Sequence, residues 1–177
     1  MLIFISGSSK SGKSSYAEAR LESFSGSVKM YIAASKVYDD EMKERVRIHK
    51  ERRKDKGFVT VECECDLASV NIPEGADIMI ESLTAWTANE MFRGECIYDS
   101  GYVIEKIHSE LETLRRKAMN LIVVAEDIFS DGITYDALTE RYMKTLAELE
   151  IMTASEADEV IEILAGMPYN YVKEQKR

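Results

Sequence analysis

One segment is the strongest indication of the fold of this chain: Gly7-Ser8-Ser9-Lys10-Ser11-Gly12-Lys13-Ser14. It has the form G-x-x-x-x-G-K-S, the pattern of a loop that binds the phosphates of a nucleoside triphosphate. The glycines of such a loop let consecutive backbone N–H groups point at one anion, and the following helix adds its unpaired donors. We expect Lys13 to reach the β- and γ-phosphates and the Ser14 hydroxyl to bind Mg²⁺.

The residues around this loop supply the context that the motif requires. Residues 2–5 form a short apolar run typical of a buried strand, and residues 13–21 have the pattern of a helix. The alternative interpretation is a serine- and glycine-rich turn that only caps a helix, and it gives Lys13 no role. We therefore favour a nucleotide-binding loop at the carboxyl end of the first strand.

Length, composition and charge bound the class of protein. A chain of 177 residues suits one globular domain, residues 1–177, and its 45% hydrophobic and 31% charged residues are ordinary for a soluble protein. The net charge of −9 argues against nucleic acid and against an anionic membrane surface as partners. No apolar run approaches the ~20 residues of a membrane span, and the N-terminus lacks a signal-peptide pattern, so we predict a cytoplasmic location.

The three cysteines and one of the two histidines give no indication of a catalytic or metal-binding role. Cys63, Cys65 and Cys96 do not have the spacing of a zinc site, and we expect reduced, structural thiols. His108 lies in a charged stretch of predicted helix, so we expect it to be solvated.

Strand and helix patterns alternate along the chain. Strands are predicted over residues 2–5, 28–33, 58–62, 78–80, 121–124 and 160–164, with a possible edge strand over 168–172. Helices are predicted over residues 13–21, 39–54, 83–92, 102–119 and 135–149, and a mobile loop over 94–101. This alternation is typical of an α/β fold with a mainly parallel sheet, helices on both of its faces and a possible antiparallel edge strand.

The predicted helix over residues 39–54 contains a second candidate site. Met42, Val46 and His49 lie on one stripe of this helix, so His49 should face the body of the protein. The cations near it in the helix are Arg45, Lys50, Arg52 and Arg53. Such cations keep an imidazole neutral and therefore nucleophilic, and guanidinium groups bind phosphates in pairs of hydrogen bonds. From these residues alone, a structural histidine at the end of a charged helix remains the favoured interpretation.

Carboxylates follow two of the predicted strands. Glu81 comes directly after residues 78–80, and Glu126 and Asp127 follow residues 121–124. An acid at a strand end beside a phosphate loop can hold Mg²⁺ or orient a hydroxyl group. Polar residues also end many strands without any such role, and the residues alone do not decide between the two interpretations.

The order of these motifs resembles a known family, the bifunctional adenosylcobinamide kinase/adenosylcobinamide-phosphate guanylyltransferases of cobalamin biosynthesis. The resembling segments are residues 7–14, 31–35, 39–42, 45–46, 49–50 with Arg53, 60–62, 81–84 and 157–160. They span most of the chain and are densest over the first ninety residues. The resemblance implies a RecA-like P-loop fold and a homotrimer.

The resemblance also implies a pair of reactions. Members of the family phosphorylate the aminopropanol hydroxyl of adenosylcobinamide with a nucleoside triphosphate, GTP or ATP, in the presence of Mg²⁺. They then transfer GMP from GTP to adenosylcobinamide phosphate through a GMP–histidine intermediate. This second reaction gives a role to a histidine that the residues alone leave structural.

The resemblance assigns these roles to residues of this chain. His49 stands at the position of the family histidine that carries GMP. Ser14 and Glu81 are expected to bind the metal ion. The residues expected to contact the nucleotide are Gly7, Ser8, Ser9, Lys10, Ser11, Gly12, Lys13, Ser14, Ala33, Ala34, Ser35, Lys50, Glu51, Arg52, Arg53, Glu62 and Glu81.

Residues 126–134 depart from the family pattern, which has Asn-Glu-Val-Gly and a Gly-Ile-Val-Pro loop in this region. This segment should meet the corrinoid or complete the second site. Two alternatives stay open beside the bifunctional enzyme: a P-loop small-molecule kinase without the guanylyl step, and a diverged GTP-binding regulatory protein, which the altered segment motivates.

Overall fold

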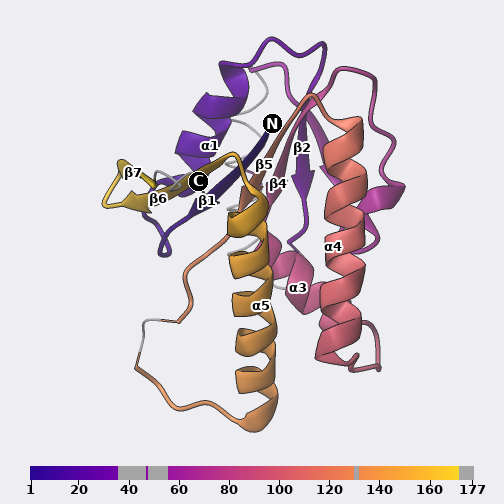
Figure 1. Cartoon of the computed structure of the whole chain (residues 1–177), viewed down its shortest axis with the longest axis vertical. Helices are drawn as coiled ribbons and strands as arrows, with labels where there is room; N and C mark the ends of the chain where they lie inside the picture. Colours follow the sequence, from indigo (N-terminus) through magenta and orange to yellow (C-terminus); the bar gives the residue numbers. More distant parts are fainter. Residues whose placement is uncertain (36–46, 48–55, 130–131, 172–177) are drawn as a thin grey trace, which may run out of the picture.

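One sheet of seven strands organises the protein (Figure 1). The computed structural model describes residues 1–35, 47, 56–129 and 132–171. In these ranges the strands are β1 (Leu2–Ser6), β2 (Lys29–Ala33), β3 (Val59–Glu62), β4 (Asp77–Glu81), β5 (Asn120–Val124), β6 (Glu159–Leu164) and β7 (Met167–Tyr171). Their order across the sheet is β3-β2-β4-β5-β1-β6-β7.

The sheet is parallel except at one edge. All pairs from β3 to β6 are parallel, and only β7 runs antiparallel, against β6. The central strands β1, β4 and β5 are almost entirely buried and each has an apolar run at its centre, as expected of parallel strands that are covered on both faces. The predicted mainly parallel sheet with an antiparallel edge strand is therefore confirmed.

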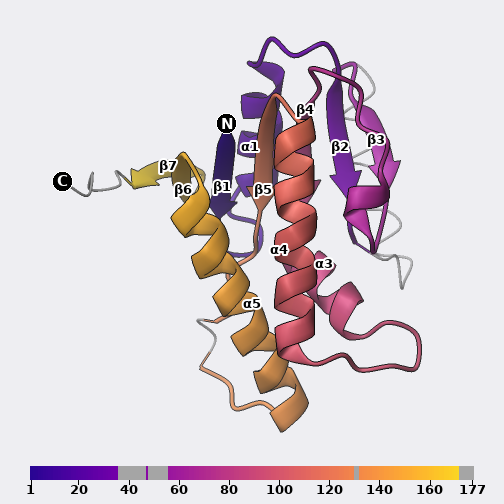
Figure 2. The same cartoon turned by 45° about the vertical axis from the view of Figure 1, so that its right-hand side comes forward.

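Helices cover both faces of the sheet (Figures 1 and 2). Helix α1 (Lys13–Glu22) packs on one face, where Ala17 and Leu21 meet Ile3 and Ile5. Helices α3 (Leu83–Met91), α4 (Ser100–Lys117) and α5 (Ala137–Glu156) cover the opposite face and contact one another, and a short 3-10 helix, η1 (Leu67–Ser69), lies beside α4. The larger of the two apolar cores lies under these three helices and contains the buried Trp86.

Several helix boundaries differ from the sequence prediction, and the start of α4 and the end of α5 have identifiable causes. Helix α4 begins at Ser100, so the end of the predicted loop over residues 94–101 is helical, and Asp99 accepts a hydrogen bond from the backbone N–H of Gly101 at 2.8 Å. Helix α5 continues to Glu156, seven residues beyond its predicted end, because buried Thr153 still packs against the core. The predicted helix over residues 39–54 lies outside the described residues.

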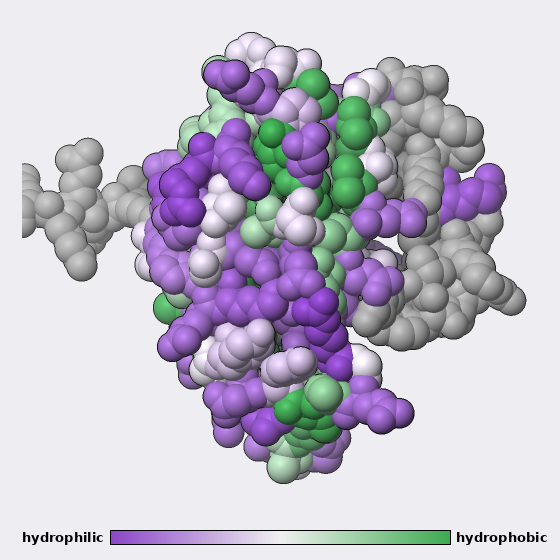
Figure 3. All heavy atoms as spheres, turned by 90° about the vertical axis from the view of Figure 1, so that its right-hand side faces the viewer, coloured by the Kyte–Doolittle hydropathy of each residue, from purple (hydrophilic) through white to green (hydrophobic). Residues whose placement is uncertain are grey.

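The face that carries α4 mixes hydrophilic residues with a hydrophobic area in its upper centre and a second one near its lower end (Figure 3). In the described ranges, none of the helices combines the length and the apolar character needed to cross a bilayer. Cys63, Cys65 and Cys96 form no disulfide, and burial raises the pKa of the Cys63 thiol, which fits the predicted reduced, structural role.

Candidate active site

The phosphate loop lies between the end of β1 and the start of α1, as the motif predicts. A Cβ atom at Gly7 would lie 2.7 Å from Ser11 Oγ and 2.8 Å from the backbone oxygen of Ile163, so only glycine fits there. Gly12 precedes the first residue of α1 with a φ of 96°, in the left-handed region that favours glycine. Both glycines of the motif are therefore required by the shape of the loop itself.

Lys13 places a nearly buried positive charge at this loop. Its Nζ lies 3.2 Å from the backbone oxygen of Ser8 and 3.4 Å from a carboxylate oxygen of Glu126, and its side chain is 10% exposed. The ion pair with Glu126 joins the loop to the end of β5. A cation in this position can bind the outer phosphates of a nucleotide by exchanging one of these partners.

Ser11 provides a second observation that fits an anion. Its hydroxyl oxygen is buried and, within the described part of the chain, has no hydrogen-bond partner. A buried polar group without a partner costs free energy. A phosphate oxygen in the loop would supply the missing hydrogen bond, so the residues present fit a bound phosphate.

The two predicted metal-binding residues lie next to each other. The Ser14 hydroxyl donates a hydrogen bond to one oxygen of the Glu81 carboxylate, and the Tyr31 hydroxyl donates to the other. A serine hydroxyl and a carboxylate are oxygen ligands of the kind that Mg²⁺ prefers. The geometry thus brings together Ser14 and Glu81, which stand 67 positions apart in the sequence.

The carboxyl ends of five strands, β1 to β5, form a row along the carboxyl-terminal edge of the sheet. In the strand register, Ile5 pairs with Val124, and Val124 pairs in turn with Glu81. Ala33 lies between Glu81 on one side and Glu62 on the other. The phosphate loop begins at this same edge, so the predicted nucleotide residues from three strands line up beside it.

Ala34 and Ser35 continue β2 beyond this row. The buried Ala34 donates its N–H to the backbone oxygen of Glu81 at 2.8 Å, and its own backbone oxygen accepts from Asn89 Nδ2 at 2.6 Å. Asn89 also donates to the backbone oxygen of Glu64 at 3.1 Å. The segment after β2 is therefore fixed to α3, a connection that the sequence did not indicate.

Five predicted site residues lie outside the described residues: His49, Lys50, Glu51, Arg52 and Arg53. Their position relative to the phosphate loop stays a prediction.

A pocket beside the phosphate loop was missed by the sequence analysis. It has a volume of about 470 Å³. The residues that line it are Ser8, Asp127, Ile128, Tyr135, Thr139, Tyr142 and Met143. Thr139, Tyr142 and Met143 share one face of α5 by their i, i+3, i+4 spacing, which is the signal by which the sequence could have shown them.

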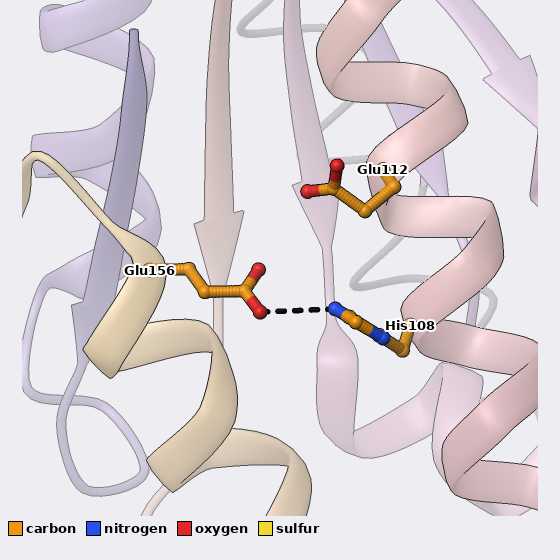
Figure 4. A group of neighbouring side chains, drawn as sticks. All are labelled: His108, Glu112 and Glu156. Atoms are coloured by element: carbon orange, nitrogen blue, oxygen red, sulfur yellow. Dashed lines mark hydrogen bonds and ion pairs between the residues drawn. The ribbon is translucent and has the colours of Figure 1, made fainter.

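Two further polar clusters lie between helices. His108 Nε2 lies 2.9 Å from a carboxylate oxygen of Glu156, with Glu112 one helical turn away on α4 (Figure 4). The side chain of His108 is 40% exposed, so the prediction of a solvated side chain is only partly right. Its contact with Glu156 links α4 to the end of α5. These contacts are consistent with a role in helix packing.

The second cluster joins α3, α4 and the chain before η1. Lys106 lies within 3.0 Å of carboxylate oxygens of Asp66, Glu90 and Glu110. Hydrogen bonds from Arg93 and Lys106 hold the pKa of Asp66 down at about 2. Each carboxylate of this cluster has a cationic partner within it, which indicates a structural role.

Comparisons with known proteins identify the family of this chain. The sequence model of a family described as "Cobinamide kinase / cobinamide phosphate guanyltransferase" matches residues 3–171. The chain is 26% identical to the "Bifunctional adenosylcobalamin biosynthesis protein CobU" of Salmonella typhimurium, covering 94% of this chain and 97% of that protein. It is 24% identical to the protein of the same description from Escherichia coli K12, with the same coverage of both chains.

Among solved structures, the fold is similar to that of "a prototypical ATPase from the type III secretion system of pathogenic bacteria". The TM-score is 0.53 at 15% sequence identity, over 91% of this chain and 50% of that chain, so this chain spans half the length of that ATPase. The likeness concerns the fold, and it confirms the predicted α/β, RecA-like P-loop architecture.

Proposed function

The chain belongs to the cobinamide kinase / cobinamide phosphate guanyltransferase family, and we propose that it is a bifunctional cytoplasmic enzyme of cobalamin biosynthesis. In the first reaction it transfers the γ-phosphoryl group of ATP or GTP to the hydroxyl group of adenosylcobinamide. In the second it joins GMP from GTP to the resulting phosphate and releases pyrophosphate. The product of both steps is adenosylcobinamide-GDP.

The observation that carries this proposal is the phosphate loop with Glu81 bonded to Ser14. The backbone of the loop and Lys13 would bind the phosphates, and the orphaned Ser11 hydroxyl would gain a partner. Ser14 and Glu81 are the residues we propose to hold Mg²⁺, which neutralises phosphate charge when bound. We propose Ala33 and Glu62 as further nucleotide contacts, and their position supports this: Ala33 pairs with Glu81 on one side and with Glu62 on the other.

We propose His49 as the nucleophile of the guanylyl step, on the basis of the family resemblance and of the arginines near it in the sequence. A ring nitrogen of His49 bonds to the α-phosphorus of GTP while the bond to the bridging oxygen breaks, and pyrophosphate leaves with the electron pair. An oxygen of adenosylcobinamide phosphate then attacks the same phosphorus. The P–N bond breaks, and the ring nitrogen regains its electron pair.

The experiment that tests this step uses GTP labelled at the α-phosphorus. The purified protein is incubated with the labelled GTP and Mg²⁺, and the protein fraction is then analysed for bound label and for the mass of an added GMP. We expect acid-labile label on the wild-type protein, mapped to the peptide that contains His49, and its loss in His49→Ala.

The chain offers a matched control, because it contains only two histidines. His108→Ala removes the other imidazole, which pairs with Glu156 on α5, and should leave the label intact. Equal labelling of His49→Ala and His108→Ala contradicts the histidine intermediate.

One alternative is a P-loop small-molecule kinase without the guanylyl step. In that case the γ-phosphoryl group reaches the acceptor, the protein carries no nucleotide label, and His49→Asn keeps its activity. The departure of residues 126–134 from the family pattern motivates the other alternative, a diverged GTP-binding regulatory protein, for which we expect GTP binding without turnover of either kind.

A further inference from the structure

Two residues join the pocket to the phosphate loop. Ser8 belongs both to the loop and to the lining of the pocket. Asp127, another lining residue, donates its backbone N–H to the backbone oxygen of Gly7 at 3.0 Å. Anything held in this pocket therefore lies next to the phosphate loop.

One wall of the pocket is apolar and well anchored. Ile128 comes from the segment that follows β5, and Tyr142 and Met143 come from α5. The Tyr142 hydroxyl donates to the backbone oxygen of Thr84 at 3.0 Å, and burial raises the pKa of this hydroxyl well above its ordinary value. The wall thus offers a fixed hydrophobic surface rather than a solvated one.

The polar groups of the pocket suit an alcohol better than a second phosphate. The lining includes an acidic residue, Asp127, and a threonine, Thr139, whose hydroxyl donates to Asp136 at 2.8 Å and keeps its oxygen as an acceptor. The pKa of a second acid, Glu150, is raised by burial and, to a smaller extent, by the charge of Asp127. Carboxylates repel an anion but accept a hydrogen bond from a hydroxyl group.

We propose that this pocket binds the hydroxyl-bearing arm of the acceptor, with Asp127 accepting the hydrogen of the reacting hydroxyl. The inference rests on the proposed kinase function and names the substrate site for it. The acceptor oxygen bonds to the γ-phosphorus, the bond from that phosphorus to the bridging oxygen breaks, and the nucleoside diphosphate leaves with the electron pair. The proton of the hydroxyl passes to the Asp127 carboxylate.

The size of the pocket limits what enters it. A volume of about 470 Å³ lies in the range of sites for small molecules. It admits a short amphiphilic alcohol, such as the aminopropanol arm, and leaves a bulky macrocycle outside. The pocket therefore selects the arm of the acceptor, and a truncated N-acyl-1-amino-2-propanol should also be phosphorylated, at a lower kcat/KM than adenosylcobinamide.

Binding of the acceptor is the first test. Met143→Trp fills the pocket, whereas Ile151→Trp adds the same side chain to the same helix at a position that is 71% exposed. Affinity for adenosylcobinamide is measured by equilibrium dialysis in the presence of a nucleotide analogue that cannot be hydrolysed, and affinity for the analogue is measured separately. We expect Met143→Trp to weaken acceptor binding about tenfold or more without changing nucleotide affinity, and Ile151→Trp to match the wild type.

Turnover tests the role of Asp127. Asp127→Asn keeps an oxygen that can accept the hydrogen bond now donated by the backbone N–H of Phe129. We expect kcat for phosphoryl transfer to fall about 100-fold, with acceptor and nucleotide affinities within about threefold of the wild type. A kcat within threefold of the wild type overturns the assignment of Asp127.

The outcomes separate this inference from the proposed function. A wild-type protein that binds the acceptor but never phosphorylates it refutes the kinase function. The pocket is then tested only by comparing the acceptor affinities of Met143→Trp and Ile151→Trp. Equal acceptor binding by Met143→Trp and Ile151→Trp overturns the pocket, as does a wild-type protein with bound nucleotide that does not bind the acceptor. Loss of nucleotide affinity in Met143→Trp would assign the pocket to the nucleotide instead.

Discussion

At the scale of single residues, Glu150 on α5 carries a half-buried carboxyl group. Its Oε1 atom is buried and has no hydrogen-bond partner among the described residues. Burial raises the pKa of Glu150 to about 7 from an ordinary value of 4.5, and the negative charge of Asp127 adds to the shift. In the folded protein this group keeps a proton that the unfolded chain releases.

This proton makes the free energy of unfolding depend on pH. Between pH 4.5 and about 7 the folded state binds one proton more than the unfolded state at this residue, so its contribution to stability falls as pH rises through that window. Glu150→Gln removes the effect. We expect the variant to be more stable than the wild type by about 1–2 kcal/mol at pH 8, after allowance for partial solvent contact, and the difference to disappear near pH 5.

Urea unfolding at pH 5 and pH 8 measures both values. Glu148→Gln is the matched control, since Glu148 lies two positions away on α5 and is exposed. The control should show no difference from the wild type at either pH. A stability gain for Glu150→Gln that is the same at pH 5 and pH 8 contradicts the raised pKa.

At the scale of elements, the start of α4 depends on one side chain. Asp99 is the N-cap residue, and its carboxylate accepts the N–H of Gly101 at 2.8 Å. At the other end of the helix, Arg115, Arg116 and Lys117 lie in the last turn, where positive charge is favourable. The helix is therefore stabilised locally at both ends.

Removing this cap should destabilise the protein. We expect Asp99→Ala to lower the free energy of unfolding by about 1 kcal/mol, because the first turn of α4 loses a hydrogen-bond acceptor. Asp99→Asn keeps a carbonyl oxygen in the same place and should stay within a few tenths of a kcal/mol of the wild type. Denaturant unfolding of the two variants decides the point, and equal loss in both would assign the effect to charge rather than to capping.

Helix ends are also where the sequence prediction was least accurate. The predicted start of α4 missed Ser100 and Gly101, because glycine and serine suggest a loop until the cap at Asp99 is taken into account. The predicted end of α5 stopped at Leu149, whereas buried contacts of Thr153 carry the helix on to Glu156. Local patterns identify an element, but packing decides how far it extends.

At the scale of the whole molecule, the edge strand β7 presents an unusual surface. All five of its residues are exposed, and they include Met167, which is 72% exposed, and two tyrosines. Family resemblance leads us to propose a homotrimer. An exposed edge strand with apolar side chains is consistent with a protein that assembles.

Light scattering coupled to size exclusion tests the assembly. A trimer of a 20.1 kDa chain should have a mass of about 60 kDa. The mass should stay constant over a range of protein concentrations, since an obligate assembly has no stable monomer. A constant mass near that of one chain contradicts the trimer.

The phosphate loop, the alternation of strands and helices and the acids at the strand ends could be predicted from the sequence, because each depends on residues that are close together along the chain. Three contacts are visible only in the folded structure: Glu81 bonds to Ser14, Lys13 pairs with Glu126, and Asp127 lines a pocket with side chains of α5. These contacts join residues 67, 113 and up to 16 positions apart. They depend on the order of the strands across the sheet, and that order follows from how the whole chain buries its apolar faces.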